Sequence, residues 1–346
     1  MAEEEHCADP GSSIVNVTVI VCTYNRCESL PKSLECIADQ SMPDGVTWEV
    51  VVVDNNSTDR TREAVEKIAA KWPGRFHYVF ESRQGLSRAR NAGIRAARGT
   101  VIVFTDDDVA MDRDWLHHLT SELHSGEWAG CGGCIIPVWI KPLPKWLSID
   151  DPKTMGTFVH FQPGDEPGEI TISPYGANMA FHRRVFETYG GFRVDLDRSG
   201  KRLLSSGDTE YGDRLLAAGE RLRYEPDAIV FHPTPINRMT KTYVLRWWFW
   251  FGYSRVVQHG LPPDIRWVVN GIPLNFLRRI ARWTLQGIVT LNPPRRFARI
   301  RTACFLAGIV AGCRDRSRHT PTSENEAGEA LWVTSKSASL ETKMRS

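Results

Sequence analysis

Three consecutive carboxylates follow an apolar run in the segment "VIVFTDDDV", which covers residues 101–109. Like charges this close repel one another, so we expect positive charge beside Asp106, Asp107 and Asp108. A site that offers only a few carboxylates suits Mg²⁺ or Mn²⁺, whose remaining coordination positions phosphate oxygens can fill. The alternative is a solvated acidic turn, because Asp also favours turns and helix caps.

The chain up to residue 105 alternates between short apolar runs and helix-like runs. The runs "IVNVTVIV", "WEVVVVD", "HYVF" and "VIVFT" are typical of buried strands. Between them, residues 60–72 carry apolar side chains at i, i+3, i+4 and i+7, and residues 85–99 predict a helix that ends at a glycine. This alternation predicts an α/β fold with a mostly parallel sheet covered by helices on both faces.

Polar side chains follow three of these strands. They are the "TYN" of residues 23–25, the "DNN" of residues 54–56 and the acid triplet of residues 106–108. Ligands of such sheets bind beyond the carboxyl ends of the strands, so we expect the three groups to converge. Neither the dinucleotide-binding glycine fingerprint nor the phosphate-binding P-loop follows the first strand, so the expected cleft is not an ordinary Rossmann site.

Charge is unevenly distributed along the 346 residues. The formal net charge is +2, yet residues 241–318 hold 14 Lys and Arg against 2 Asp and Glu, a local +12 that leaves −10 on the rest. This asymmetry indicates that the two parts meet different partners. The acidic amino terminus lacks the features of a secretory signal and the eight cysteines are irregularly spaced, so we expect a reducing, cytoplasmic setting.

Six segments together carry a resemblance to a known family. In chain order they read "VTVIVCTYNR", "VVVVDNNSTD", "GLSRARNAGIRAARG", "VIVFTDDDV", "GANMAFHRRVFETYGGF" and "SSGDTEYGDRLLAAG". As a set, over about residues 17–233, they resemble the family 2 glycosyltransferases, whose Rossmann-like GT-A fold binds nucleotide sugars. The resemblance implies a GT-A domain over residues 14–240, with a nucleotide-binding half at 14–110 and an acceptor half at 111–240.

The resemblance also implies an activity. An enzyme of this hexosyltransferase type takes a sugar from a nucleoside-diphosphate sugar, inverts its anomeric centre and uses Mg²⁺ or Mn²⁺. The expected acceptor is lipid-linked or a polysaccharide, in the synthesis of cell-surface glycans.

The implied site residues follow the matching motifs. The Arg-rich helix start would lie beside the diphosphate, since guanidinium groups and helix amino termini both favour phosphate. Arg95 and Arg98, further along that helix, are expected on a solvated face. The implied contacts to the nucleotide sugar are Thr23, Tyr24, Asn25, Arg26, Asp54, Arg83, Arg88, Asn91, Asp106 and Asp107. The implied metal ligands are Asp106, Asp108 and His232, with Asp107 open as an alternative ligand.

A second carboxylate is implied on the acceptor side. The family's catalytic base is the Asp of an E-D pair that opens a helix, and "GDTEYGDRLL" puts Asp208 at that position, with Gly207 in place of the Glu. Glu210 is the candidate that would substitute for the missing acceptor-side contact. A base that takes the proton of an acceptor hydroxyl contributes about 10²- to 10⁴-fold. The alternative for Asp208 is an ordinary helix N-cap.

Several other positions keep two interpretations each. His232 matches a metal ligand of several family members, or is a structural histidine at a strand end. Trp139 and Trp146 either stack on an acceptor sugar or seal the core. The pair Cys131-x-x-Cys134 resembles half of a zinc site, but no second pair completes it, and we interpret it as a Gly-rich strand entry.

The carboxyl-terminal part has a different composition. It opens with "TKTYVLRWWFWFGYSRVV", and further on Leu277, Leu285 and Ile288 fall on one helical face with Ile280 and Ala281. Its longest uncharged run is too short to span a bilayer. We therefore expect an amphipathic α-helical segment at residues 241–318 that binds an anionic membrane surface peripherally, on the cytoplasmic face.

The alternative is that this segment packs on the catalytic domain or on a second subunit. Residues 1–13 and 319–346 are expected to be disordered tails.

Three rival functions remain. A sugar-nucleotide pyrophosphorylase shares this sheet, but has a Gly-rich, Arg-bearing loop after the first strand, which "CTYNR" is not. A non-catalytic module that binds nucleotide sugars would have no need of Asp208. A nucleic-acid-binding protein could use the basic aromatic end to stack on single strands, but no nucleic acid partner is expected.

Overall fold

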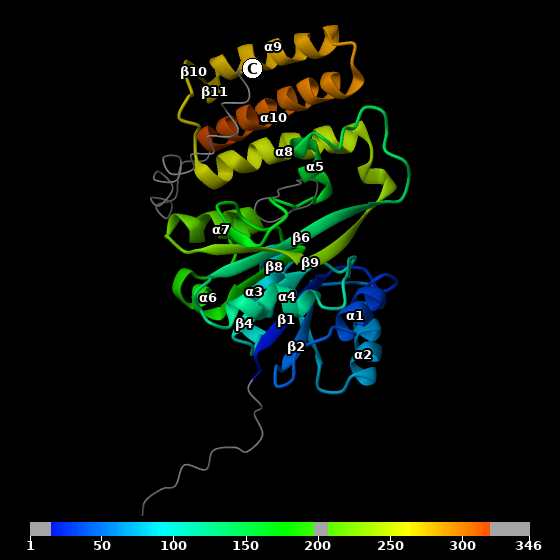
Figure 1. Ribbon diagram of the computed structural model, residues 1–346. Helices are drawn as coiled ribbons and strands as arrows, with labels where there is room; N and C mark the ends of the chain where they lie inside the picture. The colour runs from blue at the N-terminus through cyan, green and yellow to red at the C-terminus, as the bar shows by residue number, and fades with distance from the viewer. Residues whose placement is uncertain (1–14, 197–206, 319–346) are drawn as a thin grey trace, which may run out of the picture.

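The structure is a computed structural model and describes residues 15–196 and 207–318. Both expected tails, 1–13 and 319–346, lie outside these residues. In the described part, a nine-stranded sheet in the order β3-β2-β1-β4-β8-β6-β9-β5, with β7 beside β9, forms the centre (Figure 1). Its strands are β1 (Val17–Thr23), β2 (Trp48–Asp54), β3 (Phe76–Phe80), β4 (Val101–Thr105), β5 (Ala110–Met111), β6 (Gly130–Trp139), β7 (Gly168–Ile170), β8 (Asn178–His182) and β9 (Leu222–Thr234).

The first half of the sheet is parallel throughout. β1 pairs in parallel with β2 and β4, and β2 pairs in parallel with β3. Every residue of β2 is buried, as expected for a strand that helices cover on both faces. The register places Thr23 opposite Asp54, so two of the polar strand ends meet at the same edge.

The second half of the sheet is mixed. β8 runs antiparallel to both β4 and β6, whereas β6 and β9 are parallel. The short strand β5 pairs antiparallel with β9, with Ala110 opposite Phe231. The expected mostly parallel α/β fold is confirmed, and each antiparallel pair of the described sheet involves a strand of this second half.

Helices cover both faces of the sheet because successive strand residues point in opposite directions. Val19 and Val21 of β1 pack in one apolar cluster, whereas Ile20 packs in another on the opposite face. The first cluster includes α1 (Leu30–Ala38), α2 (Thr61–Lys71) and α4 (Trp115–Thr120). The second includes α3 (Leu86–Ala96), α6 (Arg183–Tyr189) and α7 (Gly207–Ala217).

Three long helices form a separate layer, which we call the helical layer. It consists of α8 (Lys241–His259), α9 (Leu274–Val289) and α10 (Pro293–Arg318). Figure 1 shows α8 next to the sheet domain, α10 beyond it and α9 outermost. The backbones of α8 and α10 approach closely, because a Cβ at Gly252 would collide with the carbonyl oxygen of Phe305, and one at Gly308 with that of Phe249.

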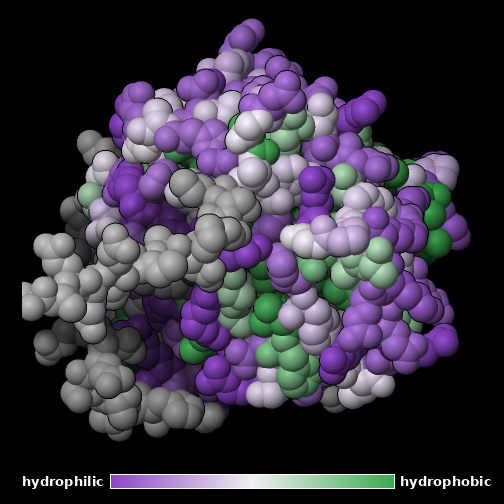
Figure 2. Space-filling view, turned by 90° about the horizontal axis from the view of Figure 1, so that it is seen from below, coloured by the Kyte–Doolittle hydropathy of each residue, from purple (hydrophilic) through white to green (hydrophobic). Residues whose placement is uncertain are grey.

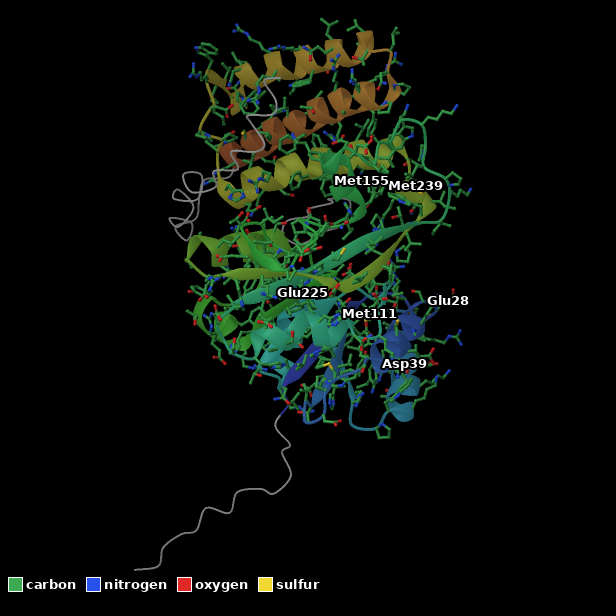
Figure 3. The ribbon with its side chains drawn as sticks, in the orientation of Figure 1. Glu28, Asp39, Met111, Met155, Glu225 and Met239 are labelled. Carbon is green, nitrogen blue, oxygen red and sulfur yellow. The ribbon has the colours of Figure 1, made fainter. Side chains whose placement is uncertain are left out.

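The helical layer is fused to the sheet domain rather than tethered to it. The ring of Trp146 lies 4.3 Å from that of Phe297 in α10. Arg301, which is buried, forms an ion pair with Asp151. Figure 3 shows Met155 at this junction, where it is buried. The interpretation that the segment packs on the catalytic domain therefore holds for α8 and α10.

Short elements complete the described chain. They are α5 (Pro152–Met155), β10 (Val268–Val269), β11 (Ile272–Pro273) and the 3-10 turns Ser121–Leu123, Gly156–Phe158, Val194–Leu196 and Ile236–Arg238. Figure 2 shows the end of the molecule far from the helical layer, where hydrophilic side chains predominate and hydrophobic ones form small patches.

Candidate functional site

Asp106, Asp108 and His232 form one cluster at the edge of the sheet. The triplet lies between the end of β4 at Thr105 and the short strand β5. Because β5 pairs with β9, the triplet comes close to His232 of β9. The Nε2 atom of His232 lies 3.6 Å from an oxygen of Asp106 and 3.9 Å from an oxygen of Asp108. One ligand atom from each of the three residues lies within 4.8 Å of the other two. Sheet topology therefore assembles residues that are far apart in the sequence.

The orientation of His232 fits a metal ligand. Its side chain is buried, and Nδ1 lies 3.1 Å from the carbonyl oxygen of Pro233. A proton on Nδ1 would donate to that carbonyl and leave Nε2 facing the carboxylates, which is the usual arrangement of a metal-binding imidazole. Burial by itself would lower the pKa of His232, but its hydrogen bond with Asp106 and the charges of Asp106 and Asp108 raise it.

Asp107 belongs to a different environment from its two neighbours. Its carboxylate accepts a hydrogen bond of 2.6 Å from the hydroxyl of Thr23 at the end of β1. Burial raises the pKa of Asp107 to about 6, with a further contribution from the charge of Asp108. Positive charge does lie beside the triplet, since Arg26 approaches Asp108 to 3.6 Å. The structure thus brings Thr23 and Arg26 to the acid triplet, as expected.

The "TYN" turn is held in place by the loop that follows β2. Asn25 has a positive φ of 51°, and its side-chain oxygen accepts a hydrogen bond from the backbone of Thr58. Its own backbone N–H donates to the hydroxyl of Ser57. Tyr24 is exposed at the tip of the turn. These two hydrogen bonds fix the turn at the edge of the site, and the Tyr24 ring remains accessible to a ligand.

Asp54 lies beneath that loop rather than on its surface. It is 2% exposed, and its oxygens accept hydrogen bonds from the Tyr78 hydroxyl and the Ser57 backbone, each of 2.8 Å. Burial raises the pKa of Tyr78, as does its hydrogen bond to Asp54. In this geometry Asp54 holds the loop, and its direct contact with a nucleoside stays a prediction.

The start of α3 carries the expected arginines in unequal surroundings. Arg83 is exposed and pairs with the buried Glu81, which also meets Arg95 at 3.6 Å. Arg88 is half-buried. Asn91 exchanges hydrogen bonds of 2.8 Å with the backbone of Phe192, which anchors α3 to the segment that follows α6.

Arg98 is exposed, as expected, but it lies beyond the end of α3 and is also paired with a buried carboxylate. Its guanidinium donates to the buried carboxylate of Glu49, which also accepts a hydrogen bond from Thr18. Burial alone would raise the pKa of Glu49, but these hydrogen bonds outweigh it and lower the pKa. The side chain of Arg98 is 59% exposed, so it covers the end of the sheet while it neutralises Glu49.

Asp208 lies in the first turn of α7 beside an arginine that was not singled out from the sequence. One oxygen of Asp208 accepts a hydrogen bond of 2.9 Å from the backbone of Gly176, and the other accepts from Thr209. A Cβ at Gly176 would collide with the guanidinium of Arg90 and would lie 3.1 Å from Asp208. The absence of a side chain at Gly176 therefore leaves room for the guanidinium of Arg90. The only sequence signal was the "RAR" of α3.

The end of β4 and Asp208 are connected through the two residues that immediately precede β8. Thr105, which precedes the triplet, donates a hydrogen bond from its hydroxyl to the carbonyl of Ala177. Gly176, the preceding residue, donates to Asp208. Thr105, at the end of β4, and Asp208, on α7, are therefore hydrogen-bonded to two adjacent residues of the chain.

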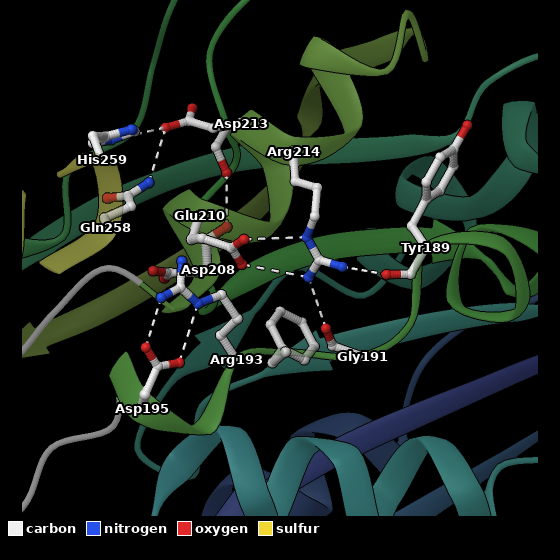
Figure 4. A network of polar contacts seen from close by, with 12 residues as sticks. Tyr189, Gly191, Arg193, Asp195, Asp208, Glu210, Asp213, Arg214, Gln258 and His259 are labelled. Carbon is white, nitrogen blue, oxygen red and sulfur yellow. Dashed lines mark hydrogen bonds and ion pairs between the residues drawn. The ribbon is translucent and has the colours of Figure 1, made fainter. Parts of the chain in front are cut away.

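Figure 4 shows a polar network deeper in α7. Glu210 is buried and pairs with Arg214, whose guanidinium also donates to the carbonyls of Tyr189 and Gly191. Arg214 therefore already compensates the charge of Glu210. The acceptor-side contact expected of Glu210 stays a prediction.

The same helix is joined to the helical layer. Asp213 accepts a hydrogen bond of 3.2 Å from Gln258 and lies 3.9 Å from Arg255 and 4.0 Å from His259, all on α8 (Figure 4). Burial raises the pKa of Asp213 to about 6 and lowers that of His259 to about 3. The helix that carries Asp208 is thus connected directly to the helical layer.

The tryptophan pair and the cysteine pair, for which the sequence left two interpretations each, both lie in apolar surroundings. The ring of Trp139 packs edge-on against Phe158 at 5.2 Å, in a cluster with Trp146 at the junction to the helical layer. The buried thiols of Cys131 and Cys134 belong to apolar clusters on opposite faces of the sheet. Neither thiol is therefore placed to share a metal ion with the other.

Comparison with known proteins identifies the class to which this fold and site belong. Residues 18–190 match the family described as "Glycosyl transferase family 2". The chain belongs to this family and is a glycosyltransferase.

Two relatives align over most of their length. The chain is 27% identical over 265 residues to "Glucosyl-dolichyl phosphate glucuronosyltransferase" of Haloferax volcanii, covering 72% of this chain and 79% of the relative. It is 27% identical over 307 residues to "Succinoglycan biosynthesis protein ExoM" of Rhizobium meliloti, covering 86% and 93%.

A solved structure shares the fold. It is the mannosyltransferase PcManGT from Pyrobaculum calidifontis in complex with GDP-Man and Mn²⁺, with a TM-score of 0.55 and 21% identity over 95% of this chain and 82% of that one. The central sheet and its helices are therefore of the GT-A type.

The link between α7 and α8 predicts a pH dependence of stability. The pKa of Asp213 rises from 3.8 to about 6, so the folded state holds a proton that the unfolded state releases in this window. Folding stability that depends on this group is therefore lost as the pH rises from about 4 to about 6. We expect the unfolding free energy of wild type to fall, over that range, relative to that of Asp213→Asn, as measured by urea titration.

His259 titrates in the opposite sense, because its lowered pKa makes stability rise with pH, but it is present in both proteins and cancels in the difference. Parallel stability curves for the two proteins would show that Asp213 is not perturbed.

Proposed function

We propose that this glycosyltransferase is inverting and metal-dependent, and that it transfers sugar from a nucleoside-diphosphate sugar to a lipid-linked acceptor in cell-surface glycan synthesis. The observation that carries the proposal is the connection of two acidic sites through adjacent residues of the chain. Thr105, which immediately precedes the triplet, and Asp208 are hydrogen-bonded to the neighbouring residues Ala177 and Gly176. The cluster of Asp106, Asp108 and His232 suits the leaving group, and Asp208 suits the attacking hydroxyl.

The cluster suits a divalent cation. Asp106, Asp108 and His232 offer two carboxylates and one oriented imidazole, which are ligands that Mn²⁺ accepts and that Mg²⁺ matches less well because of the nitrogen. When bound, such a cation would neutralise charge on the departing diphosphate. The solved mannosyltransferase in complex with Mn²⁺ supports this choice.

The protein's own groups would share the remaining work. Arg26, Arg88 and the amino terminus of α3 supply positive charge for the diphosphate. Asp208, held by two backbone N–H groups, would take the proton of the acceptor hydroxyl while the sugar is transferred. A single displacement with one base inverts the anomeric centre.

The acceptor follows from the relatives and from the helical layer. One relative is named for action on a glucosyl-dolichyl phosphate and another for succinoglycan biosynthesis, which supports an acceptor in glycan assembly on a lipid. Within the described ranges, 15–196 and 207–318, no helix combines the length and apolarity needed to cross a bilayer.

The outer face of α9 suits the membrane surface. Leu277, Leu285 and Ile288 are 42%, 63% and 65% exposed there, and Arg278 and Arg282 are exposed on the same helix. A helix with apolar and basic side chains on its free side lies in a bilayer interface, where anionic lipids of the cytoplasmic leaflet attract it. The proposed peripheral site of action is therefore that leaflet, and α9 is the contacting element.

Asp208→Asn tests the base. We expect the variant to lose about 10²- to 10⁴-fold in transfer, because the amide cannot accept the proton, and to keep its donor affinity within about twofold. The rate is measured as nucleoside diphosphate released from UDP- and GDP-sugars with a bacterial lipid extract as acceptor source, and affinity is measured by calorimetry. Release of nucleoside diphosphate also separates transfer from a pyrophosphorylase, which releases pyrophosphate or consumes it.

Asp227→Asn, an exposed carboxylate on β9, is the matched control and should behave as wild type. Near-normal turnover of Asp208→Asn with donor binding intact would remove Asp208 from the mechanism.

Leu285→Glu/Ile288→Glu tests the membrane contact. We expect its affinity for vesicles of mixed neutral and anionic lipid at low salt to fall by about tenfold or more, since two apolar side chains no longer enter the interface. Cosedimentation with the vesicles measures the bound fraction. The control Phe80→Glu/Ile172→Glu adds the same charge at exposed apolar sites outside the helical layer and should bind like wild type. Wild type that stays wholly in the supernatant would contradict the membrane contact.

A further inference from the structure

A groove runs through the helical layer, away from the acid triplet. It is an open groove of about 440 Å³, and pockets of roughly 300–1,000 Å³ are usual for ligand sites. One wall is formed by Phe249, Trp250 and Tyr253 of α8, and the other by Ala307 and Ala311 of α10. Val310 of α10, with Ile272 and Leu277 near the start of α9, completes its apolar lining.

The groove is apolar along its walls and charged at one end. The two alanines keep its α10 side open, where a larger side chain would fill it. The hydroxyl of Tyr253 donates a hydrogen bond of 2.7 Å to Asp315, so this polar group is satisfied within the protein. Arg314 and Asp315 both line the groove; Asp315 is engaged by Tyr253, and the exposed Arg314 is the positive group. An elongated ligand with a hydrocarbon body and an anionic head matches this pattern.

The position of the groove connects it with both of the surfaces already described. Leu277 lines the groove and is also 42% exposed on the outer face of α9, so an apolar path leads from that face into the groove. The helix that provides the aromatic wall, α8, also provides Arg255 and Gln258, which meet Asp213 on α7. The groove therefore opens beside the proposed membrane-facing helix, and α8, which lines it, is also joined to the helix that carries Asp208.

We infer that this groove binds the hydrocarbon chain of the lipid-linked acceptor, with Arg314 beside the phosphate of that lipid. The inference rests on the proposed transfer to a lipid-linked acceptor and assigns a place to the part of the acceptor that does not react. Holding the chain against α8 restrains the acceptor next to α7, so less orientational freedom is lost at the catalytic step.

Photocrosslinking tests this assignment without depending on turnover. The probe is a polyprenyl phosphate with a diazirine in its hydrocarbon chain, added to the full-length protein in mild detergent. Mass spectrometry of the irradiated protein should place the crosslinks in residues 249–253 and 307–311. Excess unlabelled polyprenyl phosphate should abolish them, whereas the same excess of phosphatidylglycerol should not.

Ala311→Trp should reduce the crosslinking yield by roughly tenfold or more, because the indole occupies the groove. Ala298→Trp, on the same helix but outside the groove, is the control and should crosslink like wild type. Nucleoside diphosphate binding, measured on each variant, shows that the sheet domain is intact.

Crosslinks elsewhere in wild type, or equal competition by phosphatidylglycerol, would overturn the inference whatever the variants do. Such a result would leave the proposed function standing if transfer to a lipid extract is observed. Failure of transfer with every lipid acceptor, by contrast, would contradict the proposed function itself.

Discussion

The repulsion among three carboxylates at the end of β4 is the constraint on which the site depends. The fold meets it by dividing the triplet: Asp107 is turned toward Thr23 of β1, while Asp106 and Asp108 face His232. The pairing of β5 with the end of β9 fixes this division, because it brings a buried imidazole to the strand end. Arg26 adds positive charge from the turn after β1. The acidic cluster is therefore a product of sheet topology, not of local turn chemistry.

A second carboxylate, Asp208, is positioned through the residues that pair with the end of β4. Asp208 is held from the backbone of Gly176, next to the residue that receives the hydrogen bond of Thr105. Its helix is fixed on two sides, by Glu210 and Arg214 toward the sheet domain and by Asp213 toward α8. The helical layer thus supports α7 through buried polar contacts. Of its three helices, α9 lies outermost.

Much of this arrangement could be predicted from the sequence, because its signals are local or periodic. Alternation of apolar and helical runs predicted the sheet, and the strand-end motifs predicted that Thr23 and the acid triplet converge. Contacts between distant residues could not be predicted: nothing in "RAR" shows that the guanidinium of Arg90 occupies the space beside Gly176, whose backbone holds Asp208. The composition of residues 241–318 favoured one amphipathic segment over a segment packed on the catalytic domain. Composition cannot show that Gly252 and Gly308 allow α8 and α10 to pack closely. Only α9 keeps the exposed apolar face that the pattern indicated.

The most direct test of the account is the affinity for nucleoside diphosphates with Mn²⁺ and in chelator, measured by calorimetry on wild type and on Asp106→Asn/Asp108→Asn. The account predicts that Mn²⁺ strengthens binding to wild type by about tenfold or more and that the double variant keeps only the weaker affinity seen in chelator. Equal binding by wild type in Mn²⁺ and in chelator would contradict it, as would an unchanged response to Mn²⁺ in the double variant.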